Sequence, residues 1–180
     1  MPEDELLRQV LADVAARRPV DEREQVSIER FATEVARLEH PFDEHADPVH
    51  ITASALIVGS RGIVLHRHKR LGIWVQPGGH IDPGEAPWDA ARREAAEETG
   101  LPVSWPAGQA GDPPLAHVDA HDGPRGHRHL DLRYVVHAEP VEPAPGPDES
   151  QDVRWFSWPE AIDVADVGLV GALRALDPRR

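Results

Sequence analysis

The sequence predicts an α/β sandwich with a mixed β-sheet, preceded by an N-terminal helical arm. From residue 49 onward, segments rich in β-branched residues alternate with one central and one terminal helical segment, an order typical of a sheet covered by helices. Before residue 45, apolar residues instead recur at helical spacing in two segments. We therefore expect an arm at residues 1–45 and an α/β domain at residues 46–180.

The arm is expected to contain two helices. The first covers residues 3–18, and Pro19 ends it because proline cannot continue a helix. Asp21 is expected to cap the second helix, with Glu24 completing a capping box. The second helix carries one apolar stripe: Ile28, Phe31, Val35 and Leu38. This stripe either packs on the arm's own domain or joins two copies into a homodimer, and the sequence leaves both alternatives open.

In the α/β domain, one helix is predicted from the absence of internal glycine and the many alanines between Pro87 and Thr99. Pro87 suits its first turn, and Gly100 suits the position just past its end. A terminal helix is expected at about 159–176, and the proline-rich segment 140–148 is expected to be a loop. Strands are expected at 50–58, 63–65, 73–75, 115–121, 129–136 and 153–156.

Composition excludes several classes of protein. The net charge is −13, from 19 Lys plus Arg against 32 Asp plus Glu, so nucleic-acid duplexes and anionic membranes are poor partners. No apolar run approaches the roughly 18 residues of a membrane span. The lack of cysteine excludes disulfides, thiolate zinc sites and cysteine nucleophiles. The acidic N-terminus is unlike a secretory signal, so we expect a cytoplasmic protein; 18 prolines and scarce lysine indicate a GC-rich bacterial genome.

The most informative segment runs from Gly79 to Leu101. Within it, Glu94, Glu97 and Glu98 are spaced i, i+3 and i+4, so a helix places the three carboxylates on one face. Carboxylates this close repel one another, and Mg²⁺, which prefers oxygen ligands, offsets that repulsion. Glutamates at this spacing also occur on solvated helix faces. The fixed spacing of the whole segment is too specific for that explanation.

This segment resembles the Nudix box, G-x5-E-x7-R-E-U-x-E-E-x-G-U, in which U is a bulky aliphatic residue. Every fixed position matches, and the preceding Pro77-Gly78 also matches the family. The one departure is Ala95, which is smaller than the usual residue and removes no ligand. The resemblance extends from about His50 to the C-terminus and implies a Nudix-like α/β/α sandwich with a mixed β-sheet.

The resemblance implies a divalent-metal site, with Mg²⁺ as the cofactor and Mn²⁺ as a substitute. The implied metal positions are Gly79, Glu94, Glu97 and Glu98. Arg93 is implied to hold the carboxylates in place, and Glu85 to brace the loop. Mg²⁺ neutralises a diphosphate and activates water. The implied activity is therefore hydrolysis of a phosphoanhydride bond in a nucleoside diphosphate linked to another group.

The densest basic run of the chain is a candidate for binding the phosphates of a small-molecule substrate. Its residues are His66, Arg67, His68, Lys69 and Arg70. Because the protein is acidic and the substrate anionic, we expect the run to steer phosphate groups; a solvated loop, or salt bridges to the acidic arm, are the alternatives. Trp74 and Trp155 are candidates for stacking on a base.

Two His/Asp triplets occur on expected strands: His117, Asp119 and His121, and His127, His129 and Asp131. Alternate residues of a strand share one face, so each triplet could converge on a transition metal. The alternatives are polar lining of a pocket and exposed strand faces. In a pocket, His121, His127 and Asp131 could contact a base, sugar or diphosphate.

The general base is expected outside the box. Members of the family often draw this group from a loop before the last strand, and they place a Glu about six residues ahead of a Trp. Here the loop is Pro147–Asp152, and Glu149 is the candidate, with Asp148 and Asp152 as rivals. The alternative is that all three are solubilising charges on a proline-rich loop.

Other functions stay open. One is a catalytically silent Nudix domain that binds ligands or regulates, although the intact box argues against it. Another is hydrolysis of a non-nucleotide diphosphate. An isoprenoid diphosphate isomerase of the same superfamily would need a catalytic cysteine, which this chain lacks. Substrate choice is expected to depend on segments 104–114 and 122–128.

Overall fold

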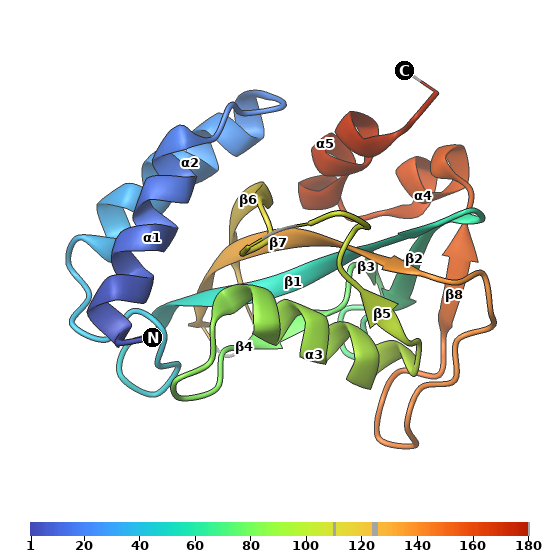
Figure 1. Cartoon of the computed structure of the whole chain (residues 1–180), viewed down its shortest axis with the longest axis horizontal. Coiled ribbons are helices and arrows are strands. Elements are labelled where there is room, and N and C mark those ends of the chain that lie inside the picture. Colours follow the sequence, from blue (N-terminus) through green and yellow to red (C-terminus); the bar gives the residue numbers. More distant parts are fainter. Residues whose placement is uncertain (110, 124–125, 180) are drawn as a thin grey trace.

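The computed structural model describes residues 1–109, 111–123 and 126–179 (Figure 1). Residues 110 and 124–125, which belong to the two expected specificity segments, lie outside this description. Within the described residues, eight strands form one mixed sheet: β1 Val49–Gly59, β2 Gly62–Arg67, β3 Trp74–Val75, β4 Gly78–His80, β5 Val103–Ser104, β6 Leu115–Asp122, β7 Arg128–Ala138 and β8 Val153–Phe156. The helices are α1 Glu3–Ala16, α2 Glu22–Val35, α3 Pro87–Thr99, α4 Trp158–Val164 and α5 Val167–Leu176.

The sheet is built around the parallel pair of β1 and β7, and the other strand pairings are antiparallel. Alternate residues of β1 point to opposite faces. On one face, Ile51 and Ala53 belong to the core formed with α3 and the arm, whereas Leu56 packs on the other face with α4 and α5. Apolar burial on both faces confirms the expected α/β/α sandwich with its N-terminal helices.

The apolar stripe of the arm packs against the arm's own domain. Phe31 is fully buried and Val35 nearly so, and α2 lies along β6. Ile28 and Leu38 are partly buried against the same core. The stripe therefore needs no second copy to cover it. The homodimer stays a prediction, as does the domain boundary at residue 45.

Glu24 differs from its expected place in a capping box. Asp21 does cap α2, because its side chain accepts the backbone N–H of Glu24 at 2.9 Å. The Glu24 side chain instead lies fully buried, where it pairs with Arg17 at 2.9 Å and accepts the N–H groups of Val20 and Val118. A buried carboxylate is costly without such partners, so Glu24 ties the arm to β6.

The central helix has the predicted bounds, and Gly100 follows it with φ +66°, the left-handed conformation that favours glycine. The predicted terminal helix was wrong in one respect, because it is two helices. Ala165 is extended and bridges to Trp74, and Asp166 caps α5 by accepting the N–H of Gly168 at 2.9 Å. No helix of the described residues is long and apolar enough to cross a membrane.

Two short strands, β4 and β5, were not predicted. β4 begins with two glycines, which carry no strand propensity. It pairs with β1, and a Cβ at Gly78 would lie 2.3 Å from the side chain of Ser54. The glycine therefore lets β4 approach β1 closely, and this approach positions the start of the box beside α3.

Candidate active site

Arg93 joins the loop before α3 to the carboxylates on the helix. Its Nε lies 3.0 Å from Oε1 of Glu85, and its Nη2 lies 2.9 Å from Oε2. Nη1 donates to Glu94 at 2.7 Å and to Glu97 at 3.3 Å, and Nη2 donates to the carbonyl of His80 at 3.0 Å. The hydrogen bond to Glu85 is the main cause that raises the pKa of Arg93. One guanidinium thus fixes the positions of three carboxylates.

Gly79 leaves room for the carboxylate of Glu94. A Cβ at Gly79 would lie 2.6 Å from Glu94 Oε1, closer than side chains approach one another. The carboxylate of Glu94, which extends from α3, therefore packs directly against the backbone of β4 at Gly79. Burial raises the pKa of Glu94, and its bond to Arg93 opposes that rise.

Glu98 lies against the backbone of β4. The N–H of Gly78 donates to Oε2 of Glu98 at 2.9 Å. Burial raises the pKa of Glu98 to about 8. His66 Nε2 lies 3.8 Å from the same oxygen, but burial lowers the pKa of His66 to about 4, so this imidazole is neutral at pH 7. The neighbouring histidine therefore supplies no positive charge to Glu98.

The donor set fits a hard divalent cation. Glu94, Glu97 and Glu98 offer carboxylate oxygens from one face of α3, and Glu97 keeps 56% of its side chain exposed. Arg93 bonds to the first two. Mg²⁺ and Mn²⁺ prefer such oxygen ligands. These residues, with the backbone of Gly79, are the ones that could hold the metal.

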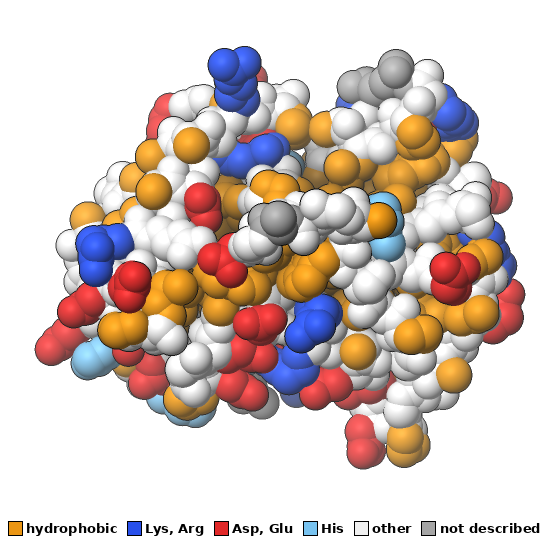
Figure 2. Space-filling model, viewed as in Figure 1, with side chains coloured by type: hydrophobic (Ala, Val, Ile, Leu, Met, Phe, Trp, Pro, Cys, Tyr) orange, Lys and Arg blue, Asp and Glu red, His pale blue; other side chains and the backbone are white. Residues whose placement is uncertain are grey.

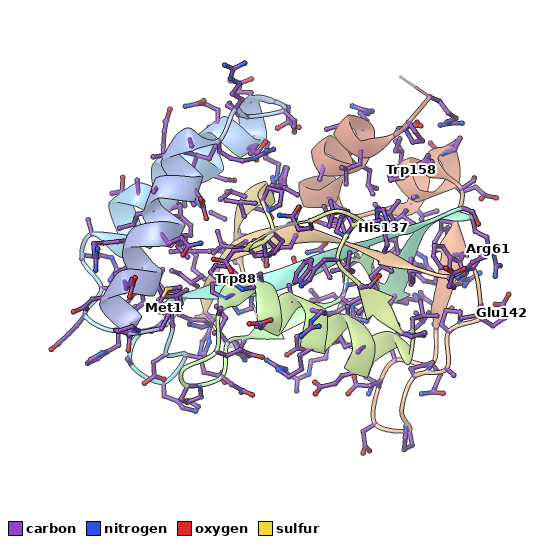
Figure 3. The ribbon with its side chains drawn as sticks, viewed as in Figure 1. Met1, Arg61, Trp88, His137, Glu142 and Trp158 are labelled. Carbon is purple, nitrogen blue, oxygen red and sulfur yellow. The ribbon has the colours of Figure 1, made fainter. Side chains whose placement is uncertain are left out.

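The proline-rich loop before β8 is tied to the turn that carries the basic run. Ser150 Oγ donates to the carbonyl of Arg67 at 2.8 Å, and the Arg67 N–H donates to the carbonyl of Asp152 at 2.8 Å. Lys69 Nζ donates to the carbonyl of Asp148. Farther up the loop, Arg61 Nη1 pairs with Glu142 at 2.5 Å (Figure 3).

The carboxylate of Glu149 on this loop acts electrostatically on the box. The charge of Glu149 helps to raise the pKa values of both Glu94 and Glu98, and Lys69 acts on Glu98 in the opposite direction. Glu149 and Lys69 are thus near the box glutamates although they come from remote segments. The structure brings these sequence candidates together.

The other residues of the basic run have different surroundings. His68 Nδ1 accepts the N–H groups of Arg70 and Leu71, at 3.3 and 3.2 Å, and so stabilises the turn. Arg67 is exposed and donates from Nε to the carbonyl of Gly72 at 3.1 Å. Arg70 is exposed. The run thus combines the buried imidazole of His66, the turn-forming imidazole of His68 and three cations at the surface.

Trp74 already has ring partners. The guanidinium of Arg154 lies 4.5 Å from its ring centroid, and Phe156 meets it edge-on at 4.9 Å. Trp155 is buried and donates from Nε1 to the carbonyl of Val141 at 2.8 Å. Both tryptophans therefore contribute to packing around β8.

Arg133, for which the sequence predicts no role in the site, lies at the centre of a buried polar network on the sheet. It pairs with Asp131 at 3.0 Å and Asp119 at 3.1 Å, and it donates to the carbonyl of Gly168 at 2.6 Å. His121 Nδ1 lies 3.0 Å from Asp119. Burial is the largest influence and lowers the pKa of His121, but the hydrogen bond to Asp119 and the charges of Asp131 and Asp119 together outweigh it, so the net shift is upward. An arginine flanked by apolar residues on a strand was the available signal.

The two His/Asp triplets do not converge as separate groups. Asp119 and Asp131 both pair with Arg133, which links the two triplets. His127 and His129 instead approach two other histidines, His50 and His80. The strand register explains this grouping, because β1 lies beside β7.

Two surface hollows of about 420 Å³ lie away from the box. One is lined by residues of α2 together with Ala120, and the other lies around His137 and Pro140. Neither contains a box carboxylate. On the face in Figure 2, acidic side chains are widely spread, with basic side chains among them. The chemistry of the box, rather than the depth of a hollow, locates the candidate site.

A comparison with protein families matches residues 48–174 to the NUDIX domain. The chain belongs to the Nudix family. The match covers the box, the β-sheet and the terminal helices, and it confirms the resemblance carried by Gly79–Leu101. As a Nudix hydrolase, the chain is an enzyme of the pyrophosphohydrolase class.

Individual relatives agree with the family. An asymmetrical bis(5'-nucleosyl)-tetraphosphatase of Caenorhabditis elegans is 29% identical over 112 residues, which cover 56% of this chain and 70% of that protein. A Nudix-family hydrolase structure from Clostridium perfringens is 28% identical, with TM-score 0.58, and covers 71% of this chain and 97% of that one. A MutT Nudix hydrolase from Burkholderia pseudomallei is 27% identical, with TM-score 0.56, and covers 71% and 98%.

Proposed function

We propose that this Nudix enzyme hydrolyses a phosphoanhydride bond in a nucleoside diphosphate linked to another group, with Mg²⁺ as cofactor and Mn²⁺ as a substitute. The observation that carries the proposal is the set Glu94, Glu97 and Glu98 on one face of α3, with Arg93 bonded to the first two. These carboxylates, with the backbone of Gly79, would hold the cation. When bound, the cation supplies charge neutralisation of the diphosphate and activation of water.

The side chains of this chain have separate tasks in the proposal. Glu149 takes the proton of the attacking water, because it is the loop carboxylate whose charge acts on Glu94 and Glu98. Lys69 and the exposed Arg67 and Arg70 attract the phosphates of the substrate. Without such cations, an anionic substrate would meet the repulsion of a chain with net charge −13.

The nucleoside part of the substrate is proposed to lie over the polar region of the sheet. Ser54 donates to Asp131 at 2.8 Å, and Gln76 donates to both, each at 3.2 Å. His121 borders this region beside Asp119. The family relative from Caenorhabditis elegans is named for a nucleotide polyphosphate, which supports a substrate of that chemical class. Trp74 would stack on a base only through ring surface that Arg154 and Phe156 leave uncovered.

A substrate panel with product identification tests the proposal. The panel contains nucleoside triphosphates, dinucleoside polyphosphates, ADP-ribose, NADH, nucleotide sugars and isoprenyl diphosphates, each with Mg²⁺, with Mn²⁺ and with chelator. We expect metal-dependent cleavage of at least one nucleotide substrate between two phosphorus atoms. Cleavage of isoprenyl diphosphates alone would favour a non-nucleotide substrate. Inertness toward the whole panel would favour a ligand-binding module.

A further inference from the structure

Four imidazoles meet at one end of the sheet, apart from the acidic face of α3. His50 comes from β1, His80 from β4 and His129 from the start of β7, and His127 immediately precedes β7. One ligand nitrogen of each lies within 4.8 Å of the others. The ring centroid of His50 is 5.1 Å from that of His80 and 5.2 Å from those of His127 and His129.

The strand register creates this meeting. His50 and His129 are direct neighbours in the parallel ladder of β1 and β7. His80 is paired with Thr52 on the other side of β1, so it lies close to the same end. Residues that are remote in sequence thus present imidazoles to one point, which no local spacing in the sequence reveals.

Two of the rings are oriented by an oxygen atom that lies beside Nδ1. His50 Nδ1 lies 3.2 Å from the carbonyl of Asp47, and His80 Nδ1 lies 3.1 Å from Oε2 of Glu44. When Nδ1 carries the hydrogen for these contacts, Nε2 keeps a free lone pair. A histidine that donates one ring N–H to a carbonyl or carboxylate typically binds a metal through the other nitrogen.

Both of these Nε2 atoms are buried. His50 is 0% exposed, and within the described part of the chain neither its Nε2 nor that of His80 has a hydrogen-bond partner. A buried polar atom without a partner is costly, so it calls for an explanation. The tilted and edge-on ring contacts contribute packing, but they give the Nε2 lone pairs no donor.

We propose that His50, His80, His127 and His129 form a second metal site, which binds a transition cation of the Zn²⁺ class. Imidazole nitrogen suits Zn²⁺ and its neighbours in the periodic table, whereas Mg²⁺ prefers oxygen. In a tetrahedral site with Zn–N bonds of about 2.1 Å, the nitrogens lie roughly 3.4 Å apart. The observed spacing of up to 4.8 Å therefore closes by small rotations of the rings.

The site has a structural role rather than a catalytic one. Four protein ligands occupy all the coordination positions of a tetrahedral zinc ion and leave none for water or substrate. The cation links β1, β4 and β7 at the end of the sheet where the box begins. His80 directly follows Gly79, and its carbonyl accepts a hydrogen bond from Arg93. A bound cation would therefore stabilise the loop that leads to the carboxylates.

Metal binding by the full chain without a histidine tag tests this proposal. The protein is stripped with chelator, loaded with Zn²⁺ or Co²⁺ in the presence of excess Mg²⁺, dialysed, and analysed for metal content, visible absorption and melting temperature. We expect one tightly held Zn²⁺ per chain, the absorption bands of tetrahedral Co²⁺, and a Zn²⁺-dependent rise in melting temperature. His127→Asn should weaken Zn²⁺ binding at least tenfold, because it removes a partly exposed ligand without emptying the core.

His137→Asn is the matched control, because His137 lies near the other end of β7 and is exposed (Figure 3). It should bind Zn²⁺ like the parent chain. Glu97→Gln should also retain the ion, since Glu97 belongs to the carboxylate site. The proposal is overturned if the parent chain holds no Zn²⁺, if His127→Asn binds Zn²⁺ as the parent does, or if Glu97→Gln is the variant that loses the ion.

Discussion

Arg93 and Glu85 form a two-point ion pair, with nitrogen–oxygen distances of 3.0 and 2.9 Å, across the loop that precedes α3. The same guanidinium bonds to Glu94 and Glu97. Glu85 therefore acts on the carboxylate site through Arg93, without contacting the cation or the substrate in our proposal. This relationship makes Glu85 a positioning residue.

Glu85→Gln should lower kcat roughly tenfold and lower stability by about 1–3 kcal/mol, because a charge-assisted pair becomes a weaker neutral contact. Steady-state kinetics and denaturant unfolding measure the two effects. Asp82→Asn is the control, since Asp82 lies 3.7 Å from Arg93 and is 72% exposed. Equal effects of the two substitutions would contradict a special role for Glu85. Raising the Mg²⁺ concentration should partly restore the activity of Glu85→Gln.

The raised pKa of Glu98, about 8, predicts how stability depends on pH. Between its unfolded value of 4.5 and about 8, the folded chain holds a proton on Glu98 that the unfolded chain has released. The metal-free protein should therefore lose stability as pH rises through this window. Glu98→Gln should remove that part of the loss.

The best range for this measurement is pH 6.5 to 8. Below pH 6.5, histidines with lowered pKa values, such as His66 and His129, make stability rise with pH, because at low pH their unfolded forms take up protons that the folded forms do not. His121 has a raised pKa and therefore makes stability fall as pH rises, as Glu98 does. The difference between parent and Glu98→Gln unfolding curves isolates Glu98. Parallel curves across this range would show that Glu98 does not titrate there.

Phe31→Ala should lower stability by about 3–5 kcal/mol, since it leaves a cavity between α2 and the sheet. Val26→Ala on the same helix is the control, because Val26 is 51% exposed and should change stability by about 0.5 kcal/mol or less. Denaturant unfolding measures both, and light scattering gives the oligomeric state. If Phe31→Ala left stability unchanged, the arm would not be part of the core.

Much of the fold and the box could be predicted from local sequence. The period of apolar residues located α2, and Pro87 and Gly100 bounded α3, because such signals depend on a few neighbouring residues. The break at Ala165 was missed because apolar residues continue across it. β4 was missed because its pairing partner, rather than its own glycines, determines it.

The remainder of the site depends on contacts between distant segments. Arg133 pairs with Asp119 through the register of β6 and β7, and His50 meets His129 through that of β1 and β7. The loop that carries Glu149 is held to the basic run by the hydrogen bond of Ser150 to the carbonyl of Arg67. Register and loop anchoring are properties of the folded chain, so spacing in the sequence does not specify them.

Glu149→Gln should lower kcat about a hundredfold with little change in KM, because a general base acts in the transition state rather than in substrate binding. The acid limb of the pH–rate profile should also flatten, since that limb reports protonation of the base. Asp148→Asn tests the rival on the same loop and should leave both features in place. Unchanged kcat and acid limb in Glu149→Gln, together with loss of turnover in Asp152→Asn, would exclude Glu149 as the base.

The carboxylate site is tested most directly by the kcat of Glu97→Gln at saturating Mg²⁺, with the best substrate of the panel. Glu97 is 56% exposed, so the substitution removes a charge and leaves the core intact. Asp89→Asn is the control, because Asp89 lies on the same helix and its side chain is half-exposed. We expect kcat to fall at least about a hundredfold in Glu97→Gln and to stay unchanged in Asp89→Asn. Near-parent turnover in a folded Glu97→Gln protein would contradict this expectation.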